Sequence, residues 1–441
     1  MDDYRRIADR ITADINSGRL RPGQQLPPQR VFARRRGIAG STAGRVYAEL
    51  VRRGLVVGEV GRGTFVRAAA TAGSYGRALI EPSTAAPVNL ELNYPSAPGQ
   101  SELLAPALAP LLRPDVLTEA LRPAPATGTA AAREAVADLL ATPAWRPAPD
   151  RVLFTGNARQ AIAAALASLV RPGGRVGVEP LTYPLVREIA GRLGITLVAL
   201  EADEGGLRPE SVRALHRAAP LSALYLQPTL HNPTSVTTGE ARKRDIADVV
   251  RESGLPVVED RIWSFLHPDS PAPLAAHAPG LAHVVDGLSK RVAPGLTVGF
   301  LVVPEERVDE VAAAIRSGGW SAGRFALEAG VRWTADGTVA RLVEAKRVDA
   351  AARQRLVAEE LAEFAVRADP LTYYAWWELP APWRADTFTA AAAEHGIAVT
   401  PGTAFGVDPK RTPDAVRLGL ASAAVPDLRR ALRTLAALAG G

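Results

Sequence analysis

The 441-residue sequence contains no cysteine, which excludes disulfide bonds, thiol catalysis and zinc sites built on cysteine. Its six histidines show no metal-ligand spacing, so no metal site is predicted. The longest nearly uncharged runs, such as AIAAALASLV, reach about half the length that a membrane-spanning helix needs, and the N-terminus has no apolar signal segment. These absences predict a soluble, cytoplasmic protein without a membrane partner.

Lysine is scarce, with four residues (positions 243, 290, 346 and 410) among 52 basic ones. One of the four, Lys290, stands beside Ser289 in the stretch DGLSKRVAPGLTVGF, at the end of an apolar run. The end of an apolar strand is a poor place for a lysine that has only a structural role. Lys290 is therefore the first candidate catalytic or binding residue.

The length predicts two or three domains, and 47% hydrophobic with 22% charged residues is typical of globular proteins. Residues 1–70 hold 14 arginines and six acidic residues, a net charge of +8, whereas the rest of the chain is nearly neutral. A small basic head on a neutral body favours a polyanionic partner, most simply double-stranded DNA. A solvated basic surface remains the alternative on charge alone, also for Arg34, Arg35, Arg36, Arg52 and Arg53.

The basic head reads as three helices followed by a β-hairpin. Apolar residues at helical spacing over 4–15 are followed by the connector LRPGQQLPPQR, a helix over 29–36 ending at Gly37, and a third helix after Gly40 capped by Ser41 or Thr42. The runs LVV and TFV then predict two short strands joined through GEVGRG. This order predicts a winged helix-turn-helix.

Residues 4–67 resemble the GntR family of bacterial regulators through LRPG, LP with Arg30, Thr42, Arg45 and GRGTFV. The resemblance implies a third helix in the major groove, with DNA contacts from the residues Arg30, Ser41, Thr42, Arg45, Arg62, Gly63 and Thr64. The family usually has Ser-Arg before this helix, where Ala39-Gly40 stands here.

From Val88 the sequence alternates helical segments with short buried strands: RVLFT, RVGVE, TLVAL, SALYLQP, PVVED, AHVVDGLS and TVGFLVV. This alternation predicts an α/β domain with a mostly parallel sheet, in which ligands bind beyond the carboxyl ends of the strands. Four strand ends deliver the turn Gly156-Asn157-Ala158-Arg159, suited to a phosphate, and the residues Asn232, Asp260 and Lys290. Singly, Asp260 could be a helix cap, Arg417 a surface ion pair and Tyr183 a core residue.

That order resembles the fold-type I enzymes that use pyridoxal 5′-phosphate (PLP), over about residues 88–438. The resemblance implies that Lys290 bonds to the cofactor aldehyde, Asp260 pairs with the pyridinium nitrogen and Asn232 binds the ring hydroxyl. It also implies stacking by Tyr183, phosphate binding by Ala158, Arg159 and Ser289, and capture of a carboxylate by Arg417.

Several expected contacts to the cofactor are missing from the sequence. Thr297 replaces a phosphate-clamping arginine, Gly287 replaces a serine, DRIW lacks the usual tyrosine after the Asp, and RPAPATG lacks the tyrosine lent by a partner subunit. Arg159 and Arg291 are the nearby candidates to supply the missing charge, and Arg159 is favoured because it lies in the phosphate turn.

The combination resembles the MocR subfamily, with a winged helix-turn-helix at 1–67, a linker at 68–87 and an aminotransferase-like domain at 88–441. The large domain divides into a part at about 120–320 and a small C-terminal α+β subdomain at about 321–441. The resemblance implies a homodimeric transcription regulator that senses PLP or an amino-acid or amine effector. Two alternatives remain: an active aminotransferase carrying a DNA-binding head, and a regulator whose large domain no longer binds PLP.

Overall fold

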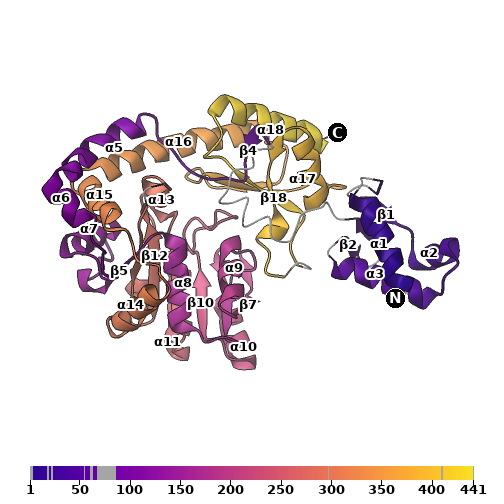
Figure 1. The fold of residues 1–441 in the computed structure, drawn as a ribbon, viewed down its shortest axis with the longest axis horizontal. Helices are drawn as coiled ribbons and strands as arrows, with labels where there is room; N and C mark the ends of the chain where they lie inside the picture. The colour runs from indigo at the N-terminus through magenta and orange to yellow at the C-terminus, as the bar shows by residue number, and fades with distance from the viewer. Residues whose placement is uncertain are drawn as a thin grey trace.

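The computed structural model in Figure 1 describes residues 3–16, 19–20, 23–53, 55–59, 63–66, 86–295, 297–408 and 411–440. Arg62 and nearly all of the predicted linker at 68–87 lie outside these residues. Within the described ranges, no helix combines the length and apolar character that crossing a bilayer requires.

The N-terminal head is the winged helix-turn-helix that its sequence predicts. Its helices and strands are α1 (Asp3–Asn16), α2 (Gln29–Arg36), α3 (Gly40–Arg52), β1 (Gln25–Leu26), β2 (Val56–Glu59) and β3 (Gly63–Val66). The helix α2 ends at Gly37, whose φ of 64° suits a residue without a side chain. The strand β1 was not predicted: the turn-rich connector pairs two residues with β3 and makes the sheet three-stranded.

The predicted cap of the recognition helix α3 is wrong. The helix begins at Gly40, before both predicted capping residues, so Ser41 and Thr42 lie inside its first turn. The capping position falls to Ala39, which makes no side-chain hydrogen bond there. The head is held instead by its apolar core, to which α1, α3 and the hairpin contribute buried residues, among them Ile11, Val46, Leu50 and Val66.

The large sheet confirms the predicted α/β fold. Its seven strands run in the order β5-β13-β12-β11-β10-β6-β7, with bounds β5 (Val152–Thr155), β6 (Arg175–Val178), β7 (Thr196–Ala199), β10 (Ala223–Leu226), β11 (Val257–Asp260), β12 (Ala282–Gly287) and β13 (Gly299–Val302). Only β13 is antiparallel to its neighbours within this sheet. The continuous apolar character of these strands follows from burial on both faces.

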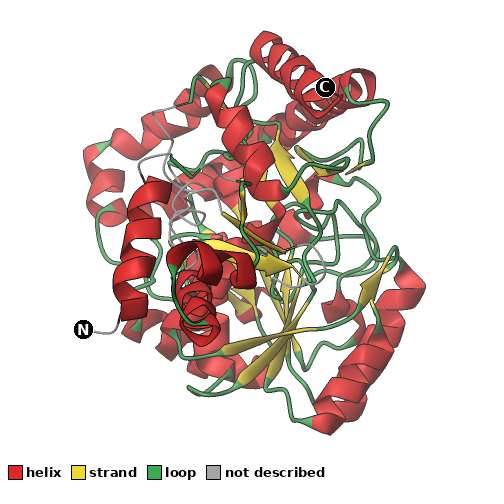
Figure 2. Cartoon of the chain, turned by 90° about the vertical axis from the view of Figure 1, so that its right-hand side faces the viewer, coloured by secondary structure: helices red, strands yellow, loops and turns green. Residues whose placement is uncertain are grey.

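Helices cover both faces of this sheet, as Figure 2 shows. One face packs on α8 (Ala158–Leu169), α9 (Pro184–Arg192) and α14 (Val308–Ser317). The other packs on α7 (Ala130–Leu140), α10 (Pro209–Ala218), α11 (Glu240–Ser253) and α15 (Arg324–Ala335). The remaining elements of this part are β8 (Ala202–Asp203), β9 (Gly206–Leu207), α5 (Gln100–Leu108), α6 (Pro114–Ala120), α12 (Leu274–His277) and α13 (Leu288–Arg291).

A second, four-stranded sheet forms the C-terminal part. Its order is β14-β15-β18-β17, and its elements are β14 (Val366–Ala368), β15 (Tyr374–Glu378), β17 (Thr400–Pro401), β18 (Ala415–Gly419), α17 (Ala385–Glu394) and α18 (Val425–Gly440). The short strand β4 (Val88–Asn89) pairs with β16 (Ile397–Ala398), which brings the start of the body onto this part. The 23-residue helix α16 (Thr338–Glu360) contacts both α15 and α18 and so connects the two parts.

The head touches the C-terminal part near α17 (Figure 1). The guanidinium carbon of Arg384, just before α17, lies 5.3 Å from the centre of the Phe65 ring on β3. This distance is within the range of a cation–π interaction, which joins the wing to the C-terminal part.

Candidate functional site

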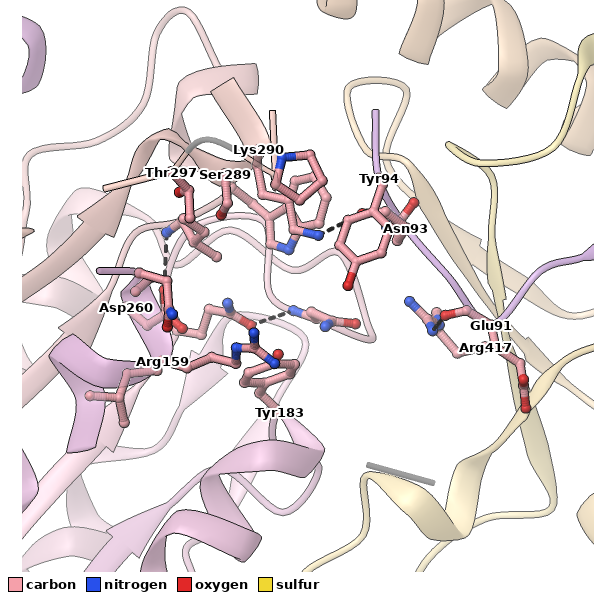
Figure 3. A pocket seen from close by; sticks show the side chains of 18 residues that line it. Glu91, Asn93, Tyr94, Arg159, Tyr183, Asp260, Ser289, Lys290, Thr297 and Arg417 are labelled. Carbon is pink, nitrogen blue, oxygen red and sulfur yellow. Dashed lines mark hydrogen bonds between the residues drawn. The ribbon is translucent and has the colours of Figure 1, made fainter. Parts of the chain in front are cut away.

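A cavity of about 160 Å³ lies at the carboxyl ends of the central strands. It collects side chains from the two parts of the body, with Arg159, Tyr183 and Asp260 on one side and Glu91 and Arg417 on the other (Figure 3). All eight residues predicted to bind the cofactor or a carboxylate line this cavity: Ala158, Arg159, Tyr183, Asn232, Asp260, Ser289, Lys290 and Arg417. These residues are up to 259 positions apart in the chain. Six of them follow from the ends of parallel strands, whereas Tyr183 and Arg417 were expected only from the family resemblance.

Lys290 extends into the cavity from the short helix α13, which follows β12. Its Nζ donates a hydrogen bond of 2.6 Å to the backbone oxygen of Asn93 and lies 4.3 Å from the centre of the Tyr94 ring. Burial, followed by the charges of Arg417, Arg159 and Lys346, lowers the pKa of Lys290 to about 7. Near neutral pH a large fraction of this amine is therefore unprotonated and able to act as a nucleophile.

Asp260 ends β11 as a buried carboxylate. It accepts hydrogen bonds from the Tyr225 hydroxyl at 2.7 Å and from the backbone N–H of Ile262 at 3.0 Å. Burial is the largest cause that raises the pKa of Asp260 to about 6, because these two donors do not replace the lost water. The carboxylate is thus short of positive charge and suited to a cationic ring nitrogen.

The turn before α8 forms another wall of the cavity. Asn157 caps the helix, since its side chain accepts the N–H of Gln160 at 3.1 Å, and the next residues open the helix toward the cavity. A Cβ on Gly299 would lie 2.2 Å from the Asn157 carbonyl carbon, so only glycine lets β13 approach this turn. The close approach fixes where the first helical N–H groups point.

Arg159 is the available positive charge at this turn. Its side chain extends into the cavity toward Tyr183 (Figure 3), and among the described residues its guanidinium has no recorded hydrogen bond or ion pair. Arg291, the other candidate, is instead buried and ion-paired with Asp286. The hydroxyl of Thr297 lines the same cavity without a described partner.

Arg417 lies on β18 and is only 2% exposed. Its guanidinium donates to the backbone oxygen of Glu91 and to Thr400 Oγ1, while its Nε has no partner among the described atoms. Burial is the largest cause that lowers the pKa of Arg417 to about 10, and the nearby Glu91 opposes it. Its burial makes the alternative of a surface ion pair wrong and leaves the guanidinium ready for an anion.

Sequence reasoning missed several residues of the site. The segment of Glu91, Asn93 and Tyr94 lines the cavity although it comes before the first helix of the body, and Gln227 accepts the Asn232 N–H at 2.9 Å. The sequence predicts Tyr225 only as part of a buried strand, so its hydrogen bond to Asp260 was not expected. The position of Gln227 directly after a parallel strand was a usable signal, whereas the N-terminal segment carried none.

The described residues among the predicted DNA contacts lie on three elements of the head. Arg30, Ser41 and Arg45 are exposed on α2 and α3, Thr42 is half-buried, and Gly63 and Thr64 begin β3. Arg52 and Arg53 instead hydrogen-bond to Glu49 on their own helix. These two arginines therefore have a structural use, while Arg34, Arg35 and Arg36 remain exposed.

Residues 118–435 match the profile of aminotransferase class I and II, which covers most of the chain. The chain belongs to this family. Residues 3–66 match the bacterial regulatory proteins of the GntR family. The two matches together make the MocR architecture that the sequence resembles.

The whole chain is similar to proteins of the same arrangement. It is 27% identical to the HTH-type transcriptional regulator YdeF of Bacillus subtilis, covering 95% of this chain and 90% of that protein. It is 26% identical to the regulator TauR of Rhodobacter capsulatus, covering 70% and 69%. Among solved structures, α-aminoadipate aminotransferase LysN of Thermus thermophilus aligns with a TM-score of 0.74 at 23% identity, covering 85% of this chain and 96% of that one, which supports the shared fold.

The aminotransferase fold implies PLP as the cofactor, and the residues of the cavity fit it. Three observations carry the fit: an amine of lowered pKa at Lys290, a buried carboxylate at Asp260 that lacks positive charge, and the unpartnered oxygens of Asn232 and Thr297. PLP offers an aldehyde, a pyridinium nitrogen, a ring hydroxyl and a phosphate, which match these groups in kind.

We expect Asp260→Asn to stabilise the cofactor-free protein as pH rises. The folded pKa of Asp260 is about 6 against an ordinary 3.8, so its contribution to stability is present below about pH 4 and is lost as pH rises through about 6. Between pH 4 and 7 the variant should gain about 2–3 kcal/mol relative to the natural protein, measured by urea unfolding. The exposed Asp269→Asn should show no such trend. A difference that does not change with pH would contradict the assignment.

Proposed function

We propose that the protein is a PLP-responsive transcription regulator whose aminotransferase-like body senses PLP, an amino compound, or both. One observation carries the proposal: Lys290, Asp260 and Arg417 share one cavity in a chain that also has a GntR-type head. The regulator names of YdeF and TauR, which align over both parts, support it. A ligand in the cavity would change the position of the head and hence DNA binding.

The roles of the cavity residues follow from their chemistry. PLP supplies an aldehyde and an electron-withdrawing ring when it is bound. Lys290 provides the neutral amine for covalent attachment, Asp260 stabilises positive charge on the ring nitrogen, and Asn232 hydrogen-bonds the ring hydroxyl. Tyr183 stacks on the ring, while Ala158, Arg159 and Ser289 surround the phosphate. Arg417 binds the carboxylate of an amino-acid effector in a bidentate manner.

The head supplies the contacts to the operator. Arg45 and Thr42 reach base edges or phosphates from α3, Arg30 contacts the backbone, and the wing adds Gly63, Thr64 and Arg62. A homodimer would present two heads to repeated or palindromic half-sites. The site of action is the cytoplasm, where the operator lies.

A working aminotransferase is the second candidate, and the complete set of Lys290, Asp260 and Arg417 favours it. The lost arginine at Thr297 and the lost serine at Gly287 favour sensing, because loose positioning of a cofactor lowers rate more than binding. Incubating the PLP-loaded protein with a panel of amino acids and a keto-acid acceptor distinguishes the two. Keto-acid formation over many turnovers would support the enzyme.

We expect purified protein to retain PLP through Lys290. After PLP is added and the excess removed, the absorbance band of bound cofactor should persist in the natural protein. It should be lost in Lys290→Ala, which removes the one side-chain amine among the described residues that line this cavity. Absence of the band in natural protein that is folded would contradict the proposal and leave the body as a scaffold without PLP.

Arg159 should replace the missing phosphate arginine. We expect Arg159→Gln to weaken PLP binding about 10- to 100-fold, the value of a hydrogen bond between charged groups. Adding Thr297→Arg to this variant should restore much of the affinity, because it returns the charge to the family position. Equilibrium titration with PLP measures both effects, and the exposed Arg192→Gln on α9 serves as the control. Equal affinity of natural protein and Arg159→Gln would reject the role.

The recognition helix gives a test of DNA binding. An operator is first selected from random duplexes with the full-length protein, and its affinity is measured by fluorescence anisotropy with and without PLP. Arg45→Ala should weaken binding about 5- to 100-fold, whereas Arg52→Ala should change it little because Glu49 engages Arg52. PLP should change the affinity of the natural protein but not of Lys290→Ala. No selected sequence, or no effect of PLP, would count against a PLP-responsive regulator.

A further inference from the structure

A second lysine contacts the segment that carries Lys290. Lys346, on α16, is completely buried, and its Nζ donates hydrogen bonds to the backbone oxygens of Lys290, Arg291 and Val292 at 3.0, 3.0 and 2.7 Å. These are the carbonyls at the end of the four-residue helix α13, which has no following turn whose N–H groups could donate to them. Lys346 therefore caps the C-terminus of α13, the helix that carries Lys290.

The geometry favours the charged form of Lys346. Three donated hydrogen bonds need three N–H groups, which the ammonium has and the neutral amine lacks. Burial lowers the pKa of Lys346 to about 7, while the three carbonyl dipoles at a helix C-terminus stabilise its positive charge. An arginine would present a planar fork in place of three converging donors, which explains a lysine in a chain that otherwise uses arginine.

The charge of Lys346 acts on a nucleophile that already lies among cations. Facing Lys290 are Arg417 from β18 and Arg159 from α8, the ring faces of Tyr94 and Trp263, and the carboxylates of Asp260 and Glu91, which line the same cavity. Lys346 adds a further positive charge on the backbone side of Lys290, where it donates to the Lys290 carbonyl oxygen. Each positive charge disfavours protonation of Lys290.

We propose that Lys346 is a positioning residue for Lys290: its ammonium fixes the backbone of α13 and keeps the Lys290 amine neutral. The inference rests on the proposed function, since it concerns the residue that we assign to cofactor attachment. The inference adds that the ability of Lys290 to bind an aldehyde depends on the charge of Lys346, which lies on α16 outside the cavity.

The chain offers a matched control for this role. Lys243, on α11, is also completely buried and also makes three hydrogen bonds, to Thr229 Oγ1 and to the backbone oxygens of Pro271 and Ala272. It does not line the cavity and is not among the charges that act on Lys290. Replacing Lys243 therefore costs structural support without changing the environment of Lys290.

The test measures the titration of Lys290 in cofactor-free protein. Competitive labelling with acetic anhydride between pH 5 and 10, read by peptide mass spectrometry, gives the midpoint for Lys290. We expect Lys346→Gln to raise this midpoint by about 0.5–1 pH unit, because glutamine retains donors but no charge. Lys243→Gln should leave it unchanged, although both variants should unfold at a lower temperature. Lys346→Arg, with a permanent charge, should keep the midpoint at or below that of the natural protein.

Three results would overturn the inference. The first is an unchanged midpoint in Lys346→Gln together with lower thermal stability, which would make Lys346 a structural residue only. The second is an equal rise in Lys243→Gln. The third is a raised midpoint of Lys290 in Lys346→Arg, and this result decides alone if Lys346→Gln does not fold. The labelling needs no cofactor, so it tests the role of Lys346 whether or not PLP binds. Failure of the natural protein to bind PLP would instead reject the proposed function.

Discussion

The site depends on one electrostatic constraint: an amine must stay neutral inside a cavity that is already rich in positive charge. Arg159 and Arg417 face Lys290 within the cavity, and Lys346 acts on it from the backbone side, against the carboxylates of Asp260 and Glu91, which line the same cavity. Such an arrangement is unfavourable without a ligand, because buried charges of like sign repel each other. A ligand with a phosphate at one end and a carboxylate at the other would relieve the repulsion at both arginines. Relief of this repulsion would favour the binding of such a ligand.

The scarcity of lysine has a structural explanation. The three lysines in the described part of the chain, at 243, 290 and 346, all occupy interior positions where a compact ammonium or amine is required. Two of them converge on backbone oxygens, and the third serves the cavity. Arginine serves mostly at exposed ion pairs, although the buried Arg353 also donates to the backbone oxygens of Leu420 and Ala423. Lys290 differs from these arginines because only a lysine amine can become neutral near physiological pH.

Periodicity and strand-end position predicted the winged head, the mostly parallel sheet and six of the eight residues around the cavity. These features are local in sequence, or follow from the rule that parallel strands end at one edge of a sheet. Tyr183 and Arg417 were expected only from the family resemblance, and Arg417 lies on the second, antiparallel sheet. Tyr225 and Lys346 could not be found in this way. Their partners, Asp260 and the carbonyls of α13, lie 35 and about 55 positions away and meet them only through packing. The predicted cap of α3 was wrong because the backbone conformation of a single residue, Ala39, decides where this helix begins.

The helix α16 gives the proposed sensing a physical route. In the N-terminal half of α16, Lys346 holds the backbone of Lys290. Further along the helix, Gln354 donates to the backbone oxygens of Thr372 and of Tyr374, the first residue of β15. The strand β15 pairs with β18, where Arg417 lies. A ligand that joins Lys290 to Arg417 therefore bridges two segments that α16 already couples, and any change in their separation must strain or move this helix. A regulator needs only such a difference between liganded and free states, not turnover. Thr297, in place of the family's phosphate-clamping arginine, is compatible with this role. The regulatory response depends on the difference in ligand-binding free energy between the two states and not on a reaction rate.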